Sequence, residues 1–245
     1  QVKQPTYFNN GTFQLNELTQ SNDGDTLRLV TQGTYAESTY VMRATLFRST
    51  KPFPRVGAAL AIRATPVSFS MSGHPSIDGH NYDITGTTLV GTGDKTGIAT
   101  MNKTDSSSVK VAAGANVDGV PPVKIDTTTI DPLQFLDIYK NNADFVYNTP
   151  GTYSNQTWGD INNPAIVYCN AGDDTSFSIK FTGGVTGCGI LIVRGNIQYN
   201  GNMNFIGLVV VDGFNSTVSF GGSGTPAIVG GIIIAGNAGA SISLK

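Results

Sequence analysis

Charged residues, histidine, cysteine and tryptophan are all scarce in this chain. Of its 245 residues, 13% are charged and the formal net charge is −2, whereas a surface that binds nucleic acid requires a basic excess. We therefore expect no nucleic-acid partner. No run of about 18 apolar residues occurs, so the sequence shows neither a signal peptide nor a membrane span. Because the first residue is Gln1, we expect a soluble fragment whose upstream leader or anchor has been removed.

The two cysteines, Cys169 and Cys188, lack the spacing of a metal site. They are compatible with one disulfide in an oxidising compartment and equally with two buried free thiols. Cys169–Cys188 is therefore a candidate disulfide.

What the chain has in quantity is an imperfect repeat of aliphatic runs. The runs begin at Ile166, Ile190, Leu208 and Ile232, so successive runs are 24, 18 and 24 residues apart. Repeats of this length are typical of coils that stack on one another, because a single coil cannot bury its apolar face alone. A glycine precedes each of the last three runs: Gly189, Gly207 and Gly231. We predict a mainly β fold, a parallel β-helix (β-solenoid).

Within each predicted coil, a continuously apolar strand is followed by an alternating one, as in residues 177–181 and 218–220. An alternating strand buries one face, whereas a continuous apolar run buries both faces. A second layer must therefore cover the outer face of the aliphatic runs. Helical spacing of Leu133, Leu136, Tyr139, Ala143 and Val146 predicts a covering helix over 131–147, with Asp131 as N-cap and Pro132 in the first turn. An upstream helix or a neighbouring subunit is the alternative cover.

The first 54 residues have a different pattern. Residues 26–32 and 38–47 are rich in β-branched and aromatic residues and predict a hairpin, which residues 12–15 extend to a small antiparallel sheet. Pro52 and Pro54 end this segment. We predict an N-terminal antiparallel β segment over 1–54 and a β-solenoid domain over 55–245.

The predicted solenoid domain is interrupted at about 84–160 by an excursion and the covering helix. Residues 84–130 contain the loop signals of 105–108 and 120–122, with short strands at most at 109–111 and 123–125. We expect the coil at 58–83 to stack against the later coils, with the excursion outside.

Both histidines lie in one segment, residues 73–83. His74, His80, Asp78 and Asp83 could together bind a divalent cation, because first-row metals accept imidazole with carboxylate. Aspartate, asparagine and glycine are also the usual turn residues, and the spacing matches no zinc pattern. We favour turn residues and assign no metal and no cofactor.

An enzyme that cleaves acidic polysaccharide would need carboxylates and a cation in one groove. The candidates are Asp173, Asp174, Lys180, Arg194 and Asp212, of which Arg194 and Asp212 follow equivalent apolar runs and would align on adjacent coils, where a salt link explains them equally well. Neither histidine lies in a nucleophile motif. We therefore assign no catalytic residue and expect no enzyme.

One aromatic pair could stack on sugars. Tyr153 and Trp158 lie close together in the chain, but burial beneath the helix is the favoured interpretation.

Four segments resemble the PilX-type pilus assembly proteins, which are bacterial minor-pilin-like proteins. They are VMRATL at 41–46, SGHPSIDG at 72–79, GCGILIVRGNI at 187–197 and GNMNFIGLVVV at 201–211. The resemblance spans most of residues 26–244. The prepilin leader and hydrophobic helix of that family would lie upstream of Gln1.

The resemblance implies a non-catalytic surface or adhesive ectodomain of a type IV pilus or related secretion system. Other pilin or pilus-assembly subunits, and a surface polysaccharide, would be its partners, at the bacterial cell surface or outside the cell. The membrane would be reached only through an upstream helix.

Two alternatives remain open on the residues. One is a secreted polysaccharide-binding or polysaccharide-lyase-like β-helix protein. The other is a bactofilin-like polymer formed by end-to-end stacking, for which an uncapped last strand at 242–244 would speak.

Overall fold

The computed structural model describes residues 5–22, 26–47, 56–73, 75–127, 133–172, 178–212, 216–221, 226–235 and 239–244. The chain divides into two compact units, Gln1–Phe53 and Pro54–Lys245. The predicted N-cap Asp131 and Pro132, and also His74, Asp173 and Asp174, lie outside the described residues. Among the described segments, no helix has the length and hydropathy needed to cross a membrane.

The first unit is a four-stranded antiparallel sheet in the order β1-β2-β3-β4, as the sequence predicts. Its strands are β1 (Thr6–Phe8), β2 (Gly11–Gln20), β3 (Thr26–Tyr35) and β4 (Ser38–Phe47). Ala36, with a φ of 51°, and Glu37 form the two-residue turn between β3 and β4. A register shift between Leu15 and Glu17 places a bulge in β2.

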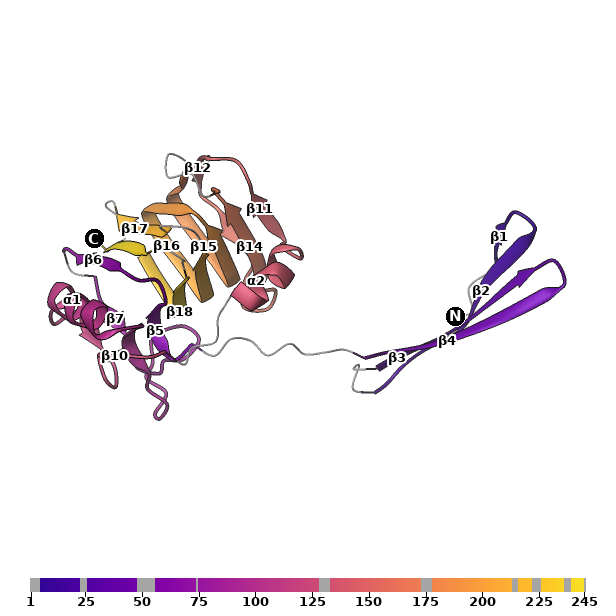
Figure 1. Ribbon diagram of the computed structural model, residues 1–245, viewed down its shortest axis with the longest axis horizontal. Coiled ribbons are helices and arrows are strands. Elements are labelled where there is room, and N and C mark those ends of the chain that lie inside the picture. Colours follow the sequence, from indigo (N-terminus) through magenta and orange to yellow (C-terminus); the bar gives the residue numbers. More distant parts are fainter. Residues whose placement is uncertain are drawn as a thin grey trace. The chain divides into compact units, whose positions relative to one another are not determined.

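The second unit is built on a large sheet in which every described pair of strands is parallel (Figure 1). Its main path is β10-β8-β5-β18-β16-β15-β14-β11. Those strands are β5 (Ala58–Ile62), β8 (Thr96–Thr100), β10 (Val123–Ile125), β11 (Phe145–Tyr147), β14 (Ala165–Asn170), β15 (Ser178–Arg194), β16 (Asn196–Asp212) and β18 (Pro226–Ala235).

Five shorter strands continue this sheet beside the main path. They are β6 (Val67–Met71), β12 (Gly151–Ser154), β13 (Thr157–Trp158), β17 (Ser216–Gly221) and β19 (Ala240–Leu244). β12 and β13 pair with β15, and β17 joins β16 to β19, which in turn pairs with β6. Residues 242–244 are therefore paired on both sides, and the prediction that they form an uncapped end is wrong.

The aliphatic runs lie side by side in this sheet, as predicted. Ile190 is in register with Ile166 and with Leu208, which matches the 24- and 18-residue steps. The last step is 23 residues, because Val209 rather than Leu208 is paired with Ile232. The early coil also stacks as expected: β5 pairs with β18, and β6 pairs with β19.

Both halves of β15 pack on one core. Ile179 and Phe181 from its first half lie in the same buried cluster as Leu191 and Val193 from its second half. A straight strand of 17 residues could not bring its two ends to a common core, so the strand bends around it. Lys180, between Ile179 and Phe181, is more exposed, which confirms the predicted alternation.

The continuous runs bury both faces, also as predicted. In β15, Leu191 and Val193 face the inner core, while Ile192 belongs to a second buried cluster on the outer face. Part of the cover comes from α2 (Leu133–Lys140), whose Leu136 and Tyr139 pack into this outer cluster. Figure 1 shows α2 beside β14.

The covering helix is shorter than the sequence predicts. It ends at Lys140, and the Asn142 side chain donates to the carbonyl oxygen of Ile138 at 2.7 Å near the helix end. Val146, assigned to the helix face, lies instead in β11, which pairs with β14. Two aromatic residues around a valine form a strand here because the open edge of β14 supplies partners for their backbone groups.

The predicted excursion at 84–130 contributes structure that the sequence did not reveal. β8 is completely buried and pairs with both β5 and β10. Residues 109–111, predicted as a short strand at most, lie in the helix α1 (Lys103–Ala113), which packs on β6. The short strand at 123–125 is confirmed as β10.

Helix α1 begins at a cap hidden in a polar stretch. The Asn102 side chain accepts a hydrogen bond from the Asp105 backbone N–H at 2.9 Å, and Asp105 in turn accepts one from the Val67 N–H at 3.1 Å. The three serines that follow suggested a loop, but burial of Val109 and Ala113 against the core makes the segment helical.

A column of glycines marks one bend of the stacked strands. Gly189, Gly207 and Gly230 are mutually in register, with φ values of 130°, 137° and 139°. A Cβ atom on Gly207 would overlap the carbonyl oxygen of Gly189, and one on Gly230 would overlap that of Gly207. The third member is thus Gly230 and not Gly231, as the sequence suggested. Only glycine allows this backbone conformation and this approach together.

We therefore expect Gly207→Ala to destabilise the second unit by about 3 kcal/mol or more, through backbone strain and overpacking. Chemical denaturation followed by circular dichroism measures the change. Gly184→Ala is the matched control, because Gly184 lies in the neighbouring strand with open space around its Cα. Equal stability of the two variants would contradict the argument.

Candidate functional site

The segment that contains both histidines leads into a loop at one side of the second unit. Its short strand β7 (Ile77–Asp78) pairs with β9 (Val117–Asp118) in a separate two-stranded sheet. Gly79 follows, and its backbone donates to the Asp118 carbonyl and accepts from the Lys95 N–H. These bonds close the base of a loop over residues 80–94.

Asp78, His80 and Tyr82 form a hydrogen-bonded cluster at this base. Asp78 Oδ1 accepts from the His80 backbone N–H at 2.9 Å and lies 2.6 Å from His80 Nδ1. Tyr82 donates its hydroxyl proton to the other oxygen, Asp78 Oδ2, at 2.6 Å. Both carboxylate oxygens are therefore used within the loop.

The cluster shifts the pKa of each member. The hydrogen bond to Asp78 raises the pKa of His80, with smaller contributions from the charges of Asp94 and Asp118. Burial opposes ionisation of Asp78, but the hydrogen bonds from Tyr82 and His80 outweigh it, so the pKa of Asp78 lies below its ordinary value. The same bond raises the pKa of Tyr82.

The remaining acidic side chains of the loop serve as turn acceptors. Asp94 accepts from the Asn81 backbone N–H at 3.0 Å. Asp83 accepts from the Thr85 hydroxyl at 2.8 Å and from the Thr87 N–H at 3.1 Å, so it is directed into its own turn. Of the four predicted ligands, the structure brings Asp78 and His80 together. Among the described residues, no group of three metal-ligating side chains is found.

The arrangement pairs an imidazole with an orienting carboxylate, which are two parts of a nucleophilic triad. Among the described residues, the recorded partner of the His80 ring is Asp78. The hydrogen-bond pattern is that of a loop fastened at its base by a charge-assisted contact.

We predict that the pKa of His80 lies above about 6.5 and falls towards that value in Asp78→Asn. Because the folded-state pKa exceeds the unfolded one, the contact stabilises the protein below about pH 6.5, and the gain is lost as the pH rises through the folded value. An NMR titration of the imidazole, assigned with His80→Gln, measures the shift. Asp94→Asn is the control, with a smaller fall expected; an unchanged His80 pKa in Asp78→Asn would refute the assignment.

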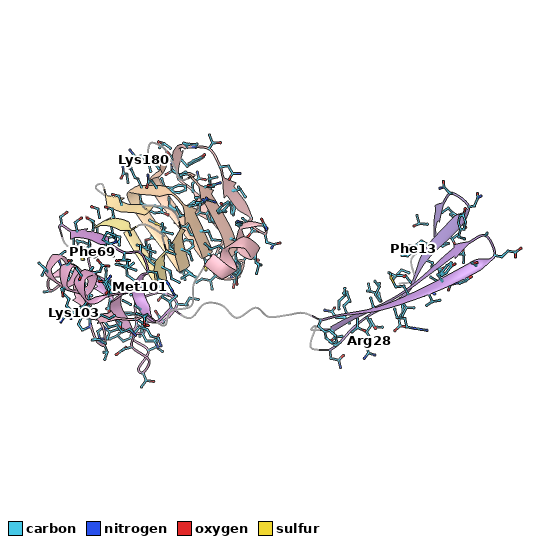
Figure 2. All side chains as sticks on the ribbon, viewed as in Figure 1. Phe13, Arg28, Phe69, Met101, Lys103 and Lys180 are labelled. Atoms are coloured by element: carbon cyan, nitrogen blue, oxygen red, sulfur yellow. The ribbon has the colours of Figure 1, made fainter. Side chains whose placement is uncertain are left out.

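The polysaccharide-cleaving candidates are only partly juxtaposed. Arg194 and Asp212 are in register at the ends of β15 and β16, as their positions after the apolar runs predict. Lys180, labelled in Figure 2, lies in the first half of β15, in register with Thr152 and Gln198. Fourteen residues of β15, including the glycine bend, thus separate Lys180 from Arg194.

The aromatic pair is buried in a different place from the one expected. Trp158 is fully buried in the inner core, on the opposite side of the sheet from α2. Its ring packs edge-on against Phe181, with centroids 4.9 Å apart, and its Nε1–H donates to Tyr147 Oη at 2.9 Å. Tyr153 is partly buried beside Tyr147, so burial rather than sugar stacking explains the pair.

Tyr147 is the polar link of this aromatic cluster, and sequence reasoning missed it. Its hydroxyl accepts from Trp158 and donates to Gln156 Oε1 at 2.6 Å. Burial raises the pKa of Tyr147. The only available signal was a buried Trp N–H, which requires an acceptor.

Tyr147→Phe should lower the free energy of unfolding by about 1–3 kcal/mol, because it leaves the buried Trp158 N–H without its acceptor. Urea unfolding followed by the fluorescence of Trp158, the single tryptophan, gives the change. Tyr153→Phe is the matched control: its hydroxyl donates to the carbonyl of Thr149, an exposed bond that water replaces. We expect less than about 0.5 kcal/mol there, and a larger loss for Tyr153→Phe than for Tyr147→Phe would contradict the assignment.

Both cysteines are buried free thiols. Cys169 is in register with Val193, which is five residues beyond Cys188 along β15. Burial raises the pKa of the Cys169 thiol, which disfavours the reactive thiolate.

Comparison with protein-family models, with curated proteins and with solved structures finds no match to this chain.

Proposed function

We propose that this chain is a non-catalytic ectodomain that presents a rigid surface, as a minor-pilin-like component of a type IV pilus or a related secretion system. The observation that carries the proposal is the uninterrupted parallel ladder from β10 to β11 around a filled core. Such a ladder gives a long, stiff face with polar turns at its margin.

The register supports a β-solenoid as the fold of the second unit. β16 repeats β15 residue for residue over 17 pairs, and β17 with β18 repeats β16 after a gap. Each of these layers contributes to the same inner core, through residues such as Phe181, Phe205 and Ile234. A chain that passes the same core once per layer is a stack of coils.

The interior of the ladder supports a surface function. Trp158, Phe181, Phe205, Leu191 and Met203 are among the largest fully buried side chains, and they fill the space between the sheet arms. Interactions of the second unit therefore fall to its outer side chains and turns. The Asp78–His80–Tyr82 cluster is one such turn, held in shape by its own hydrogen bonds.

The resemblance of four segments to PilX-type proteins supports the pilus assignment. In that arrangement, an upstream helix would anchor the protein in the pilus, and the two units would project from the bacterial surface. Pilin or pilus-assembly subunits would be the partners, with a surface polysaccharide as a further ligand.

A polysaccharide-binding or lyase-like role is the second candidate. The alignment of Arg194 with Asp212 on adjacent strands favours it, since a cation and a carboxylate recur at equivalent positions. A bactofilin-like polymer is the third; the exposed edge strand β11, with Val146 and Phe145 accessible, would be the end that stacks.

The pilus proposal predicts that the protein co-purifies with pili sheared from the producing bacterium. Inactivation of the prepilin peptidase should remove it from this fraction, because an unprocessed anchor cannot enter the filament. Quantitative mass spectrometry of the sheared and cell-bound fractions measures both effects. Recovery as a free protein in the culture fluid, unchanged by the peptidase, would overturn the proposal.

Two assays on the purified chain separate the alternatives. A lyase would generate unsaturated, ultraviolet-absorbing ends from acidic polysaccharides in the presence of calcium, and Arg194→Ala would abolish this. A polymer would sediment as filaments that grow with concentration. We expect neither result.

A further inference from the structure

The N-terminal sheet of the first unit has one apolar and one polar face. The register of β2, β3 and β4 arranges their residues in cross-strand rows, and successive rows point to opposite sides. One set of alternate rows contains almost only apolar side chains. Its members are Phe13 and Tyr40; Leu15, Thr31 and Met42; Leu18, Leu29 and Ala44; and Leu27 and Leu46.

The other set of rows is polar. It carries the threonine rows, the glutamine row and all three charged side chains of these strands, Glu17, Arg28 and Arg43. Figure 2 labels Phe13, from the apolar face, and Arg28, from the polar face. The bulge after Leu15 preserves this segregation, because it returns Leu18 to the apolar side.

The apolar face is open within the first unit. Phe13, Leu18, Tyr40, Met42 and Leu46 have exposed fractions between 51% and 69%. Among the described residues, this unit contains no helix and no second sheet. A single sheet cannot bury an apolar face by itself and becomes stable when a second layer packs against it.

We propose that the second layer is the same apolar face of another copy of this chain, so that two N-terminal sheets pack face to face. The interface is self-complementary: it contains no charged side chain from the three long strands, so two identical faces meet without burying an unpaired charge. Two twisted sheets pack in this way in β-sandwiches.

The size of the face fits a stable dimer. Ten-residue strands are about 33 Å long, and three strands spaced about 4.8 Å apart span roughly 14 Å, or on the order of 460 Å² of projected face per copy. The accessible area of a side-chain surface exceeds its projection, so two such faces bury on the order of 1,000 Å² or more. That is the area that a specific interface requires.

Sedimentation equilibrium of the full chain across the micromolar range tests the proposal. We expect a concentration-dependent mass that approaches two chains. Met42→Glu, on the apolar face of β4, should weaken the dimer roughly 100-fold or more, because it buries an unpaired charge. Thr45→Glu introduces the same side chain on the polar face of the same strand and should leave the dimer intact. Far-ultraviolet circular dichroism checks that both variants fold.

Three results would overturn the proposal. A wild-type chain that remains monomeric and does not bind a hydrophobic dye would show that its own second unit covers the face. A monomer that binds the dye would assign the face to a different protein. A dimer that Met42→Glu and Thr45→Glu weaken equally would place the interface elsewhere.

Discussion

The second unit depends on the close approach of glycine backbones where its strands bend. Gly189, Gly207 and Gly230 stand over one another with positive φ, and a side chain on the latter two would occupy the carbonyl oxygen of the strand beside it. Because the bend recurs at the same register, each aliphatic run falls beside the previous one. The inner and outer apolar clusters both follow from that alignment.

The two units meet the demand for a second layer in different ways. In the second unit, the strand halves enclose one core, and α2 covers part of the outer face. In the first unit, the strands are straight enough to form one antiparallel layer, and the apolar face stays open among the described residues. The contrast assigns internal stability to one unit and association to the other.

The polar groups that suggested chemistry are mainly structural in their contacts. Asp78, Asp83 and Asp94 each accept hydrogen bonds from their own loop, and the Trp158 N–H is satisfied by Tyr147. Such internal satisfaction keeps turns and core in one conformation. It favours a protein that acts through its shape.

The sequence by itself determined the aliphatic repeat, the pairing of its runs, the alternating strands and the N-terminal hairpin, since period and residue type follow directly from which faces are buried. It also identified Asp78 and His80 as neighbours in a turn. Only the tertiary structure decided that residues 145–147 are a strand, that residues 103–113 are a helix, and that Gly230 completes the glycine column. In each case a distant backbone or core surface supplied the deciding contact, and no local pattern records such a contact.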